Sequence, residues 1–295
     1  MTDGRVDAIF DAIARRRRLA RLHNDIIRPE FWRSLNPQLT ITDEPFAPRV
    51  VPRKISHADA LIHADFLQEE GYLQAPPLFT PEEVEPLRLG VQRVVDAGLP
   101  SGMAWLYDEF YLMLASVAPV LEPMLGDAPL IVPEDFWIFY VPPGTVDRTG
   151  FGPYGPHRDY WVDPWYARGE RPRVLAAWIP LTDVTPLDSC LYVVHPQGDP
   201  DFASTTQEVR PDTWAVTDIR ALPAPAGSVL AFGSRIAHWG SRSSRFATGP
   251  RISLACGLQH RDVPPFGSHP IDPAMPLPWK HRLDLVLDTI GRAGR

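Results

Sequence analysis

The segment VLAAWIPLTDVTPLDSCLYVV, residues 174–194, contains two short apolar runs joined by a stretch rich in turn-forming residues. Apolar runs of roughly four to eight residues bounded by Pro, Asp and Ser are typical of buried β-strands. Runs of this kind lie at residues 136–141, 174–181, 190–194, 228–232 and 251–257. Many short strands joined by turns that contain Pro and Gly predict a mainly β protein, either a sandwich or a barrel of the jelly-roll type.

The part of the chain before residue 130 has a different pattern, because its apolar residues recur at helical spacing. Thr80, Pro81 and Glu83 match the start of a helix, with a capping box and a proline in the first turn. Helices are expected over residues 1–35, 58–70, 81–97, 107–117 and 280–290, and a short strand over 72–74. We divide the chain into an N-terminal helical extension and linker, residues 1–55, and one large domain, residues 56–295, whose jelly-roll core spans about residues 130–260.

The composition excludes several classes of function. The net charge of −7 argues against nucleic acid as the main partner, and the run Arg15 to Arg18 fits the solvated face of a helix. No apolar run reaches the roughly 18–20 residues that span a membrane, and the N-terminus lacks the apolar stretch of a signal peptide. Cys190 and Cys256 cannot form a disulfide framework and are expected to be small buried side chains, so the sequence favours a cytoplasmic protein.

Two histidines and one aspartate are candidate metal ligands. In His157-Arg-Asp159 the first and third side chains project to the same side if the segment is extended. His238 follows an apolar run, and we expect this strand to run into a turn and present the imidazole at its end. Two histidines and one carboxylate on one face leave coordination positions open, as in the facial triad of non-haem iron(II) oxygenases. We therefore predict that His157, Asp159 and His238 bind iron(II); the alternative for His238 is a hydrogen-bonded histidine of the barrel wall.

The H-x-D pattern alone is not specific, because it recurs along the chain. The other pairs are His57/Asp59, His63/Asp65 and His260/Asp262. The first two lie in or beside an expected helix, where residues i and i+2 diverge, and the last leaves too little chain for the remaining strands. Residues 157–160 also resemble a kinase catalytic loop, and residues 150–155 match GxGxxG. The other kinase motifs are absent from the sequence, and Pro153 and Pro156 disfavour the helix that a dinucleotide site requires.

Arg251 and Ser253 are the candidate anchor for 2-oxoglutarate. They lie on an expected strand beyond His238 and share one face by strand alternation. If 2-oxoglutarate chelates iron through one carboxylate and its keto oxygen, its far carboxylate needs a cation, and a guanidinium matches a carboxylate in bidentate fashion. Arg242 and Arg245 in the preceding loop are alternative anchors. An aromatic group that follows the first two candidate ligands is interpreted either as a substrate wall or as core packing; it comprises Tyr160, Trp161, Trp165 and Tyr166, of which the first three are the candidate substrate residues.

The order H-x-D, strands, His and then Arg-x-Ser resembles the phytanoyl-CoA dioxygenase-like family of iron(II)/2-oxoglutarate oxygenases. Further segments that resemble this family are residues 66–73, 78–84, 178–183, 188–194 and 225–232. The resemblance covers roughly residues 60–260. It implies a double-stranded β-helix with flanking helices and a reaction that uses iron(II), 2-oxoglutarate and O₂. One departure is His195-Pro-Gln-Gly, where the family often has Pro-Gly-Ser-His.

The resemblance implies hydroxylation of an unactivated C–H bond in a small molecule or natural-product intermediate, with release of succinate and CO₂. Related halogenases have a small residue at the position of Asp159, so its presence favours hydroxylation. Desaturation, cyclisation and epimerisation by the same iron chemistry stay open. Two other classes are a catalytically silent jelly-roll binding protein and a cupin-type metal enzyme independent of 2-oxoglutarate. The expected partner is a small-molecule substrate, without nucleic acid or membrane, and the N-terminal extension either covers the barrel or forms a homodimer contact.

Overall fold

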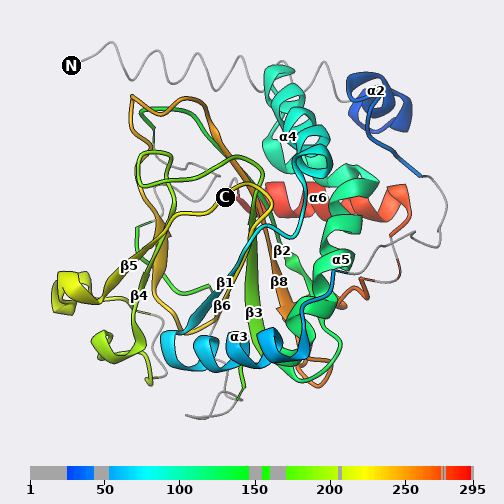
Figure 1. Ribbon diagram of the computed structural model, residues 1–295. Helices are drawn as coiled ribbons and strands as arrows, with labels where there is room; N and C mark the ends of the chain where they lie inside the picture. Colours follow the sequence, from blue (N-terminus) through cyan, green and yellow to red (C-terminus); the bar gives the residue numbers. More distant parts are fainter. Residues whose placement is uncertain are drawn as a thin grey trace.

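The computed structural model of the chain describes residues 25–42, 53–145, 155–159, 171–204, 208–273, 275 and 277–293. Two antiparallel sheets face each other, and helices cover the outer side of the larger sheet (Figure 1). The longer elements are α2 (Pro29–Leu35), α3 (His57–Glu70), β1 (Tyr72–Ala75), α4 (Pro81–Asp96), α5 (Asp108–Leu125), β2 (Leu130–Val141), β3 (Val174–Pro180), β4 (Leu191–Val194), β5 (Ile219–Leu222), β6 (Val229–Gly233), β7 (His238–Gly240), β8 (Arg251–Gln259) and α6 (Trp279–Ala293). Short 3₁₀ turns lie at Ser101–Leu106, Pro196–Gly198, Pro211–Thr213 and Val216–Asp218.

The strand order identifies the architecture. The larger sheet has the order β1-β6-β3-β8-β2 and the smaller sheet the order β5-β4-β7. Every pair of neighbouring strands is antiparallel. Strands that are distant in the chain therefore lie side by side, as they do when a jelly roll is wound from two facing sheets. The mainly β, jelly-roll core predicted from the sequence is confirmed.

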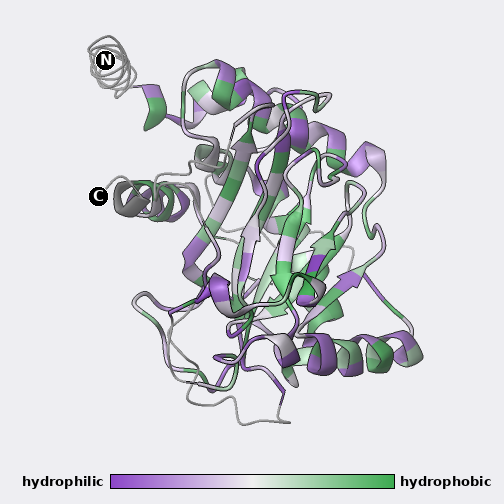
Figure 2. Cartoon of the chain, turned by 90° about the vertical axis from the view of Figure 1, so that its left-hand side faces the viewer, coloured by the Kyte–Doolittle hydropathy of each residue, from purple (hydrophilic) through white to green (hydrophobic). Residues whose placement is uncertain are grey.

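The central strand β3 separates two hydrophobic cores. Leu175, Ala177 and Ile179 point toward the helices and join the core formed with α4, α5 and α6. Ala176 and Trp178 point the other way and join the core between the two sheets. Because both faces are covered, every residue of β3 is buried, and this explains why its sequence is continuously apolar rather than alternating. The strands at the centre of the molecule are largely hydrophobic (Figure 2).

The helix α5 corrects the sequence prediction. It was expected to end at residue 117, but it continues through Pro119 and Pro123 to Leu125 and stops at Gly126, whose φ of 86° is the left-handed conformation that glycine adopts readily. A proline inside a helix removes a hydrogen bond and costs about 3 kcal/mol. Most of α5 is buried against the larger sheet, and this packing outweighs the propensity of the two prolines.

Residues before α3 also belong to the core on the helical side. Trp32, Leu39 and Ile41 pack in the same cluster as α4 and α5, and the Trp32 carbonyl accepts a 2.8 Å hydrogen bond from the Tyr107 hydroxyl. The predicted helix over residues 1–35 is described only from residue 25 onward, where α2 forms. The arginine run at residues 15–18 lies outside the described residues.

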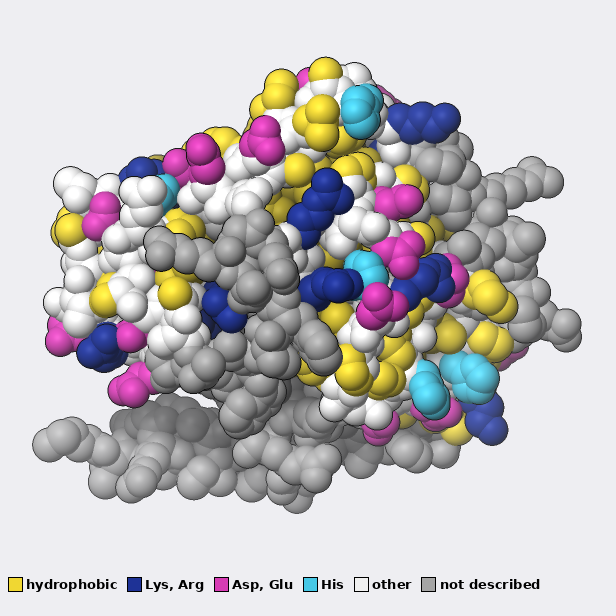
Figure 3. Space-filling model, turned by 90° about the horizontal axis from the view of Figure 1, so that it is seen from below, with side chains coloured by type: hydrophobic (Ala, Val, Ile, Leu, Met, Phe, Trp, Pro, Cys, Tyr) yellow, Lys and Arg dark blue, Asp and Glu magenta, His cyan; other side chains and the backbone are white. Residues whose placement is uncertain are grey.

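The described surface is chemically mixed. Seen from the side of α3, positive and negative side chains are interspersed, and Leu61, Ile62 and Phe66 of α3 are exposed (Figure 3). None of the described helices is both long and apolar enough to cross a membrane. The prediction for the cysteines is confirmed, since Cys190 and Cys256 are buried free thiols, and burial raises the pKa of Cys190 to about 11.

Candidate metal centre

Three predicted ligands converge at one end of the smaller sheet. The Nε2 atoms of His157 and His238 lie 3.4 and 3.3 Å from the same oxygen, Oδ1 of Asp159. One candidate ligand atom from each residue lies within 4.8 Å of the other two. The two imidazole rings are 4.4 Å apart between centroids, which leaves Asp159 beside both. Two neutral nitrogens and one carboxylate oxygen on one side of an ion fit the donor set of a facial triad.

Backbone pairing brings the ligands together. The amide of His157 donates to the carbonyl of His238, and the amide of His238 donates to the carbonyl of His157, both at 3.0 Å. The segment that carries His157 is therefore paired with β7 at the first residue of that strand. This corrects one expectation: β6 ends at Gly233, a turn follows, and His238 begins the next strand instead of ending the apolar one.

Each histidine is oriented by its own chain. Nδ1 of His157 lies 2.9 Å from the carbonyl oxygen of Gly155, and Nδ1 of His238 lies 3.2 Å from that of Ile236. In both cases the acceptor is two residues earlier. A carbonyl accepts only, so Nδ1 carries a proton in each ring, and Nε2 is the nitrogen that faces Asp159 and that can bind a metal ion once its own proton is displaced. This outer hydrogen bond is the usual device by which proteins fix the tautomer of a metal-binding histidine.

The electrostatics favour an ionised carboxylate between the two rings. Burial acts to raise the pKa of Asp159, but the charge of His238 and hydrogen bonds from both histidines hold it well below its usual range. Burial acts to lower the pKa of His157, but the hydrogen bond and the negative charge of Asp159 outweigh it and raise this pKa. A cation at this position would replace the protons that the histidines share with Asp159.

Arg251 lies inside the sandwich, whereas the alternative anchors do not. Arg251 is 2% exposed and Ser253 is fully buried, while Arg242 and Arg245 are exposed. The Arg251 guanidinium donates to the Ser189 carbonyl at 2.9 Å. Ser189 has a φ of 64°, which is rare outside glycine and often marks a functional position. The buried Ser253 hydroxyl has no hydrogen-bond partner among the described residues, so it is available to hydrogen-bond a ligand.

Gly240 sets the position of the guanidinium relative to the triad. A Cβ atom on Gly240 would lie 3.0 Å from a terminal nitrogen of Arg251, so glycine leaves the room that this side chain occupies. Gly240 is two residues after His238 on β7, and two residues of a strand span about 7 Å. The Arg251 guanidinium therefore lies beside β7 at the level of Gly240, two residues along the strand from His238. Sequence reasoning missed Gly240, although its position two residues past a ligand on a strand was a usable signal.

Aromatic residues of the larger sheet line the space between the sheets near these groups. The Arg251 guanidinium lies 5.4 Å from the ring centre of Phe139 and 5.9 Å from that of Trp178. Phe232 lies 4.3 Å from the ring of His238. Phe139 and Ser253 are paired residues of β2 and β8 and therefore share a face. Low-polarity walls of this kind strengthen the attraction between a guanidinium and a carboxylate.

Other predicted residues are placed elsewhere. His57, Asp59, His63 and Asp65 all lie in α3. His260 and Asp262 follow β8, and the Asp262 side chain is 78% exposed. Among the described residues, the structure brings together only one H-x-D pair with a third ligand. Tyr160, Trp161 and Trp165 lie outside the described residues.

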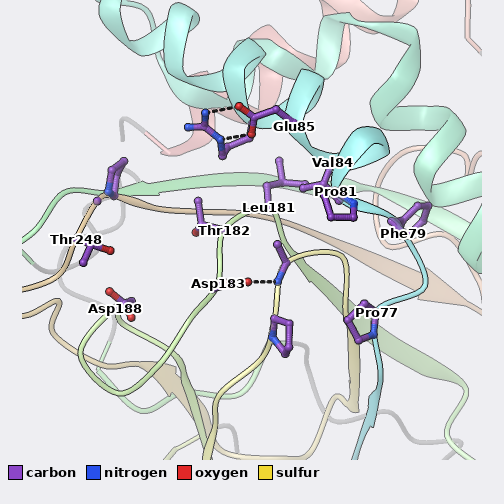
Figure 4. A pocket seen from close by; sticks show the side chains of 15 residues that line it. Pro77, Phe79, Pro81, Val84, Glu85, Leu181, Thr182, Asp183, Asp188 and Thr248 are labelled. Atoms are coloured by element: carbon purple, nitrogen blue, oxygen red, sulfur yellow. Dashed lines mark hydrogen bonds and ion pairs between the residues drawn. The ribbon is translucent and has the colours of Figure 1, made fainter.

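A separate open cavity of about 780 Å³ lies where the N-terminus of α4 meets the loops that follow β3 and precede β8 (Figure 4). Phe79, Val84 and Leu181 form its apolar side, and the Glu85–Arg88 ion pair lies at its edge. Asp183 accepts a 2.8 Å hydrogen bond from the Ala226 amide and is thereby engaged in holding a loop. None of the three candidate metal ligands lines this cavity, so it is distinct from the metal centre.

Comparison with models of protein families gives a match to part of the chain. Residues 113–247 match the family described as "Phytanoyl-CoA dioxygenase (PhyH)", and this range includes all three candidate ligands. Comparison with curated proteins returned no match.

Several solved structures share the fold. A non-haem monooxygenase, ThoJ in its apo form, is 14% identical, with a TM-score of 0.57 over 78% of this chain and 98% of that chain. The ThoJ–Ni complex is 14% identical, with a TM-score of 0.55 over 78% of this chain and 96% of that chain. SnoK, a non-haem α-ketoglutarate-dependent carbocyclase from nogalamycin biosynthesis, is 20% identical, with a TM-score of 0.51 over 73% and 88%. At these identities the likeness concerns the fold, and the site must carry the argument for function.

Proposed function

We propose that this chain, whose residues 113–247 match the phytanoyl-CoA dioxygenase (PhyH) family, is an iron(II)- and 2-oxoglutarate-dependent oxygenase whose activity resides in residues 56–295. The observation that carries the proposal is the convergence of His157, Asp159 and His238, with one ligand atom of each within 4.8 Å of the others. Both histidines already present Nε2, since Nδ1 of each is hydrogen-bonded to a carbonyl.

Each group in the site has a role in this proposal. His157, Asp159 and His238 would hold iron(II) on one face, and Arg251 with Ser253 would bind the far carboxylate of 2-oxoglutarate. Iron(II) and 2-oxoglutarate would supply the oxidation itself: O₂ is consumed, one oxygen atom enters succinate as CO₂ leaves, and the other oxidises the substrate. Phe139, Trp178 and Phe232 would exclude water from this space.

We further propose that the substrate is a small molecule or a natural-product intermediate and that the outcome is hydroxylation. The carboxylate of Asp159 supports this outcome over halogenation, because it fills the position that a halide ion would need. The fold itself serves a monooxygenase and a carbocyclase among the similar structures, so ring closure, desaturation and epimerisation stay as alternatives to hydroxylation.

The test of the proposed function is release of succinate. The purified full chain is incubated aerobically with iron(II) and labelled 2-oxoglutarate, with and without a panel of candidate substrates. We expect labelled succinate that depends on both iron and O₂ and increases with a true substrate. Metal binding without succinate from any member of the panel would favour the silent binding protein. Oxidation of a substrate without 2-oxoglutarate would favour the cupin-type enzyme.

Arg251→Met is expected to raise the KM for 2-oxoglutarate by roughly 10- to 150-fold, the equivalent of the ~1.5–3 kcal/mol of a hydrogen bond to a charged group. The kcat should change less, because the far carboxylate is bound equally before and during the reaction. Initial rates at varied 2-oxoglutarate measure both constants.

The matched controls for this variant are Arg242→Met and Arg245→Met, which remove exposed arginines of the same loop and should leave the KM unchanged. A rise in KM in either control, together with a normal KM in Arg251→Met, would show that Arg242 or Arg245, and not Arg251, binds the far carboxylate of 2-oxoglutarate.

A further inference from the structure

The residue between the first two ligands, Arg158, points away from the metal centre. Side chains alternate along an extended segment, so His157 and Asp159 project to one side and Arg158 to the other. The Arg158 side chain is only 3% exposed, and its partner Asp199 is 1% exposed. An arginine is buried to this degree only when its donors are satisfied.

Arg158 is hydrogen-bonded to three separate segments. Nε donates to the carbonyl of Arg235 at 2.9 Å, and one terminal nitrogen donates to the carbonyl of Glu208 at 2.6 Å. The other terminal nitrogen donates to Oδ2 of Asp199 at 2.5 Å. Asp199 is itself held, because its Oδ1 accepts from the Asp201 amide at 3.1 Å. The planar guanidinium can satisfy all three acceptors at once, whereas a lysine ammonium lacks this fixed fork.

The position of Arg235 gives this network its significance. Its carbonyl lies in the turn between β6 and β7, three residues before His238. Arg158 lies between His157 and Asp159 in the chain. Its guanidinium therefore connects their segment to the turn that precedes His238. Among the described residues, the backbone hydrogen bonds that join residues 155–159 to another strand are the His157–His238 pair. Arg158 adds a second, independent attachment between the two halves of the triad.

We propose that Arg158, with Asp199, is a positioning residue that sets the spacing between the His157/Asp159 segment and His238. The inference rests on the proposed function, since it concerns the geometry of the metal site. Arg158 touches neither metal nor substrate and acts only through the backbone that it anchors. Removing the Arg158 side chain leaves all three ligand side chains in the sequence. It also removes a contact that holds His157 and Asp159 at coordination distance from His238.

The test uses Co(II), whose visible absorption reports both occupancy and coordination geometry. The full-length apo protein is titrated with Co(II) well below its unfolding temperature, and the free energy of unfolding is measured in parallel. Arg158→Met is expected to bind Co(II) 10- to 100-fold more weakly, the range typical of residues that support a metal ligand, with an altered spectrum. Arg158→Lys keeps the charge but loses the fork and should lie between Arg158→Met and wild type; it carries the test should Arg158→Met not fold.

A double variant separates positioning from stability. Arg158→Met leaves the Asp199 carboxylate buried without a counter-charge, which destabilises the fold. Adding Asp199→Asn neutralises that carboxylate, so stability should recover while Co(II) binding stays weak. The matched control is Arg210→Met, which removes the Arg210–Asp201 pair of the same region, in which the Arg210 side chain is 49% exposed. This control should bind Co(II) as the wild type does.

The outcomes are distinguishable. Co(II) affinity that returns together with stability in the double variant, or that is unchanged in Arg158→Met, overturns the positioning role and leaves the proposed function intact. A wild-type protein that binds no Co(II) overturns the proposed metal site and this inference with it. Weak binding in the stabilised double variant, beside normal binding in the wild type and in Arg210→Met, supports the inference.

Discussion

Asp159→Ala is expected to weaken iron(II) binding by more than ~100-fold and to abolish measurable succinate release, because even residues that only support a ligand are worth 10- to 100-fold. Asp159 is the one charged ligand, and its Oδ1 lies within 3.4 Å of both imidazole nitrogens. Its loss removes a metal ligand and also the group that keeps the two rings facing each other. Metal titration and labelled 2-oxoglutarate, both in chloride-free buffer, measure the two effects without a halide ion in the vacated position.

The chain provides a matched control for this variant. Asp262→Ala removes the aspartate of another H-x-D pair, with the same spacing from His260 but on the surface, and should change neither quantity. Retention of the wild-type rate of succinate release in Asp159→Ala would show that Asp159 is not a ligand and would remove the basis of the proposed function.

Asp108→Ala is expected to lower the free energy of unfolding by about 3–5 kcal/mol, a large fraction of the ~5–15 kcal/mol of a typical domain. Asp108 begins α5 and lies 2.5 Å from the Arg282 guanidinium of α6, and both side chains are at most 3% exposed. Arg282 also donates to the carbonyls of Leu106 and Thr42 at 2.8 Å. Without Asp108 this buried guanidinium would lose its counter-charge. Chemical denaturation monitored by tryptophan fluorescence measures the loss.

Two controls test the cause of this loss. The double variant Asp108→Leu/Arg282→Met removes both charges and should recover part of the stability, because no ion is left stranded. Glu85→Ala breaks the exposed Glu85–Arg88 pair and should cost less than ~1 kcal/mol. A loss in Asp108→Ala as small as that in Glu85→Ala would contradict the role of the buried pair.

Three strands of the larger sheet could be predicted because buried strands consist of short, continuous runs of apolar residues. The runs at 174–181, 228–232 and 251–257 correspond to β3, β6 and β8 within a few residues. β5, residues 219–222, was missed, since IRAL has one exposed and two half-buried positions and no apolar run. The length of α5 was missed because tertiary packing overrides the two prolines, and packing partners are not visible in a local pattern.

The candidate site also has a part that could be predicted from the sequence and a part that could not. The convergence of His157, Asp159 and His238 and the burial of Arg251 could be predicted, because strand alternation fixes which side chains share a face, and an ordered set of such pairs is distinctive. The hydrogen bonds that orient the histidines and the contacts of Arg158 could not be identified. Most of them are made to backbone carbonyl oxygens, up to 77 positions away for the Arg158–Arg235 contact, and a carbonyl has no side-chain identity to read.

The missing side chain at Gly240 has a consequence for interpreting homologous sequences. An arginine can be retained at the position of Arg251 and still be unable to reach its place if a larger residue occupies the position of Gly240. In a homologue with valine or isoleucine at this position, the arginine would remain in the sequence without room for its side chain in this place. The residue two places after the last histidine therefore indicates whether a chain of this fold has room for the arginine in the place that Arg251 occupies here.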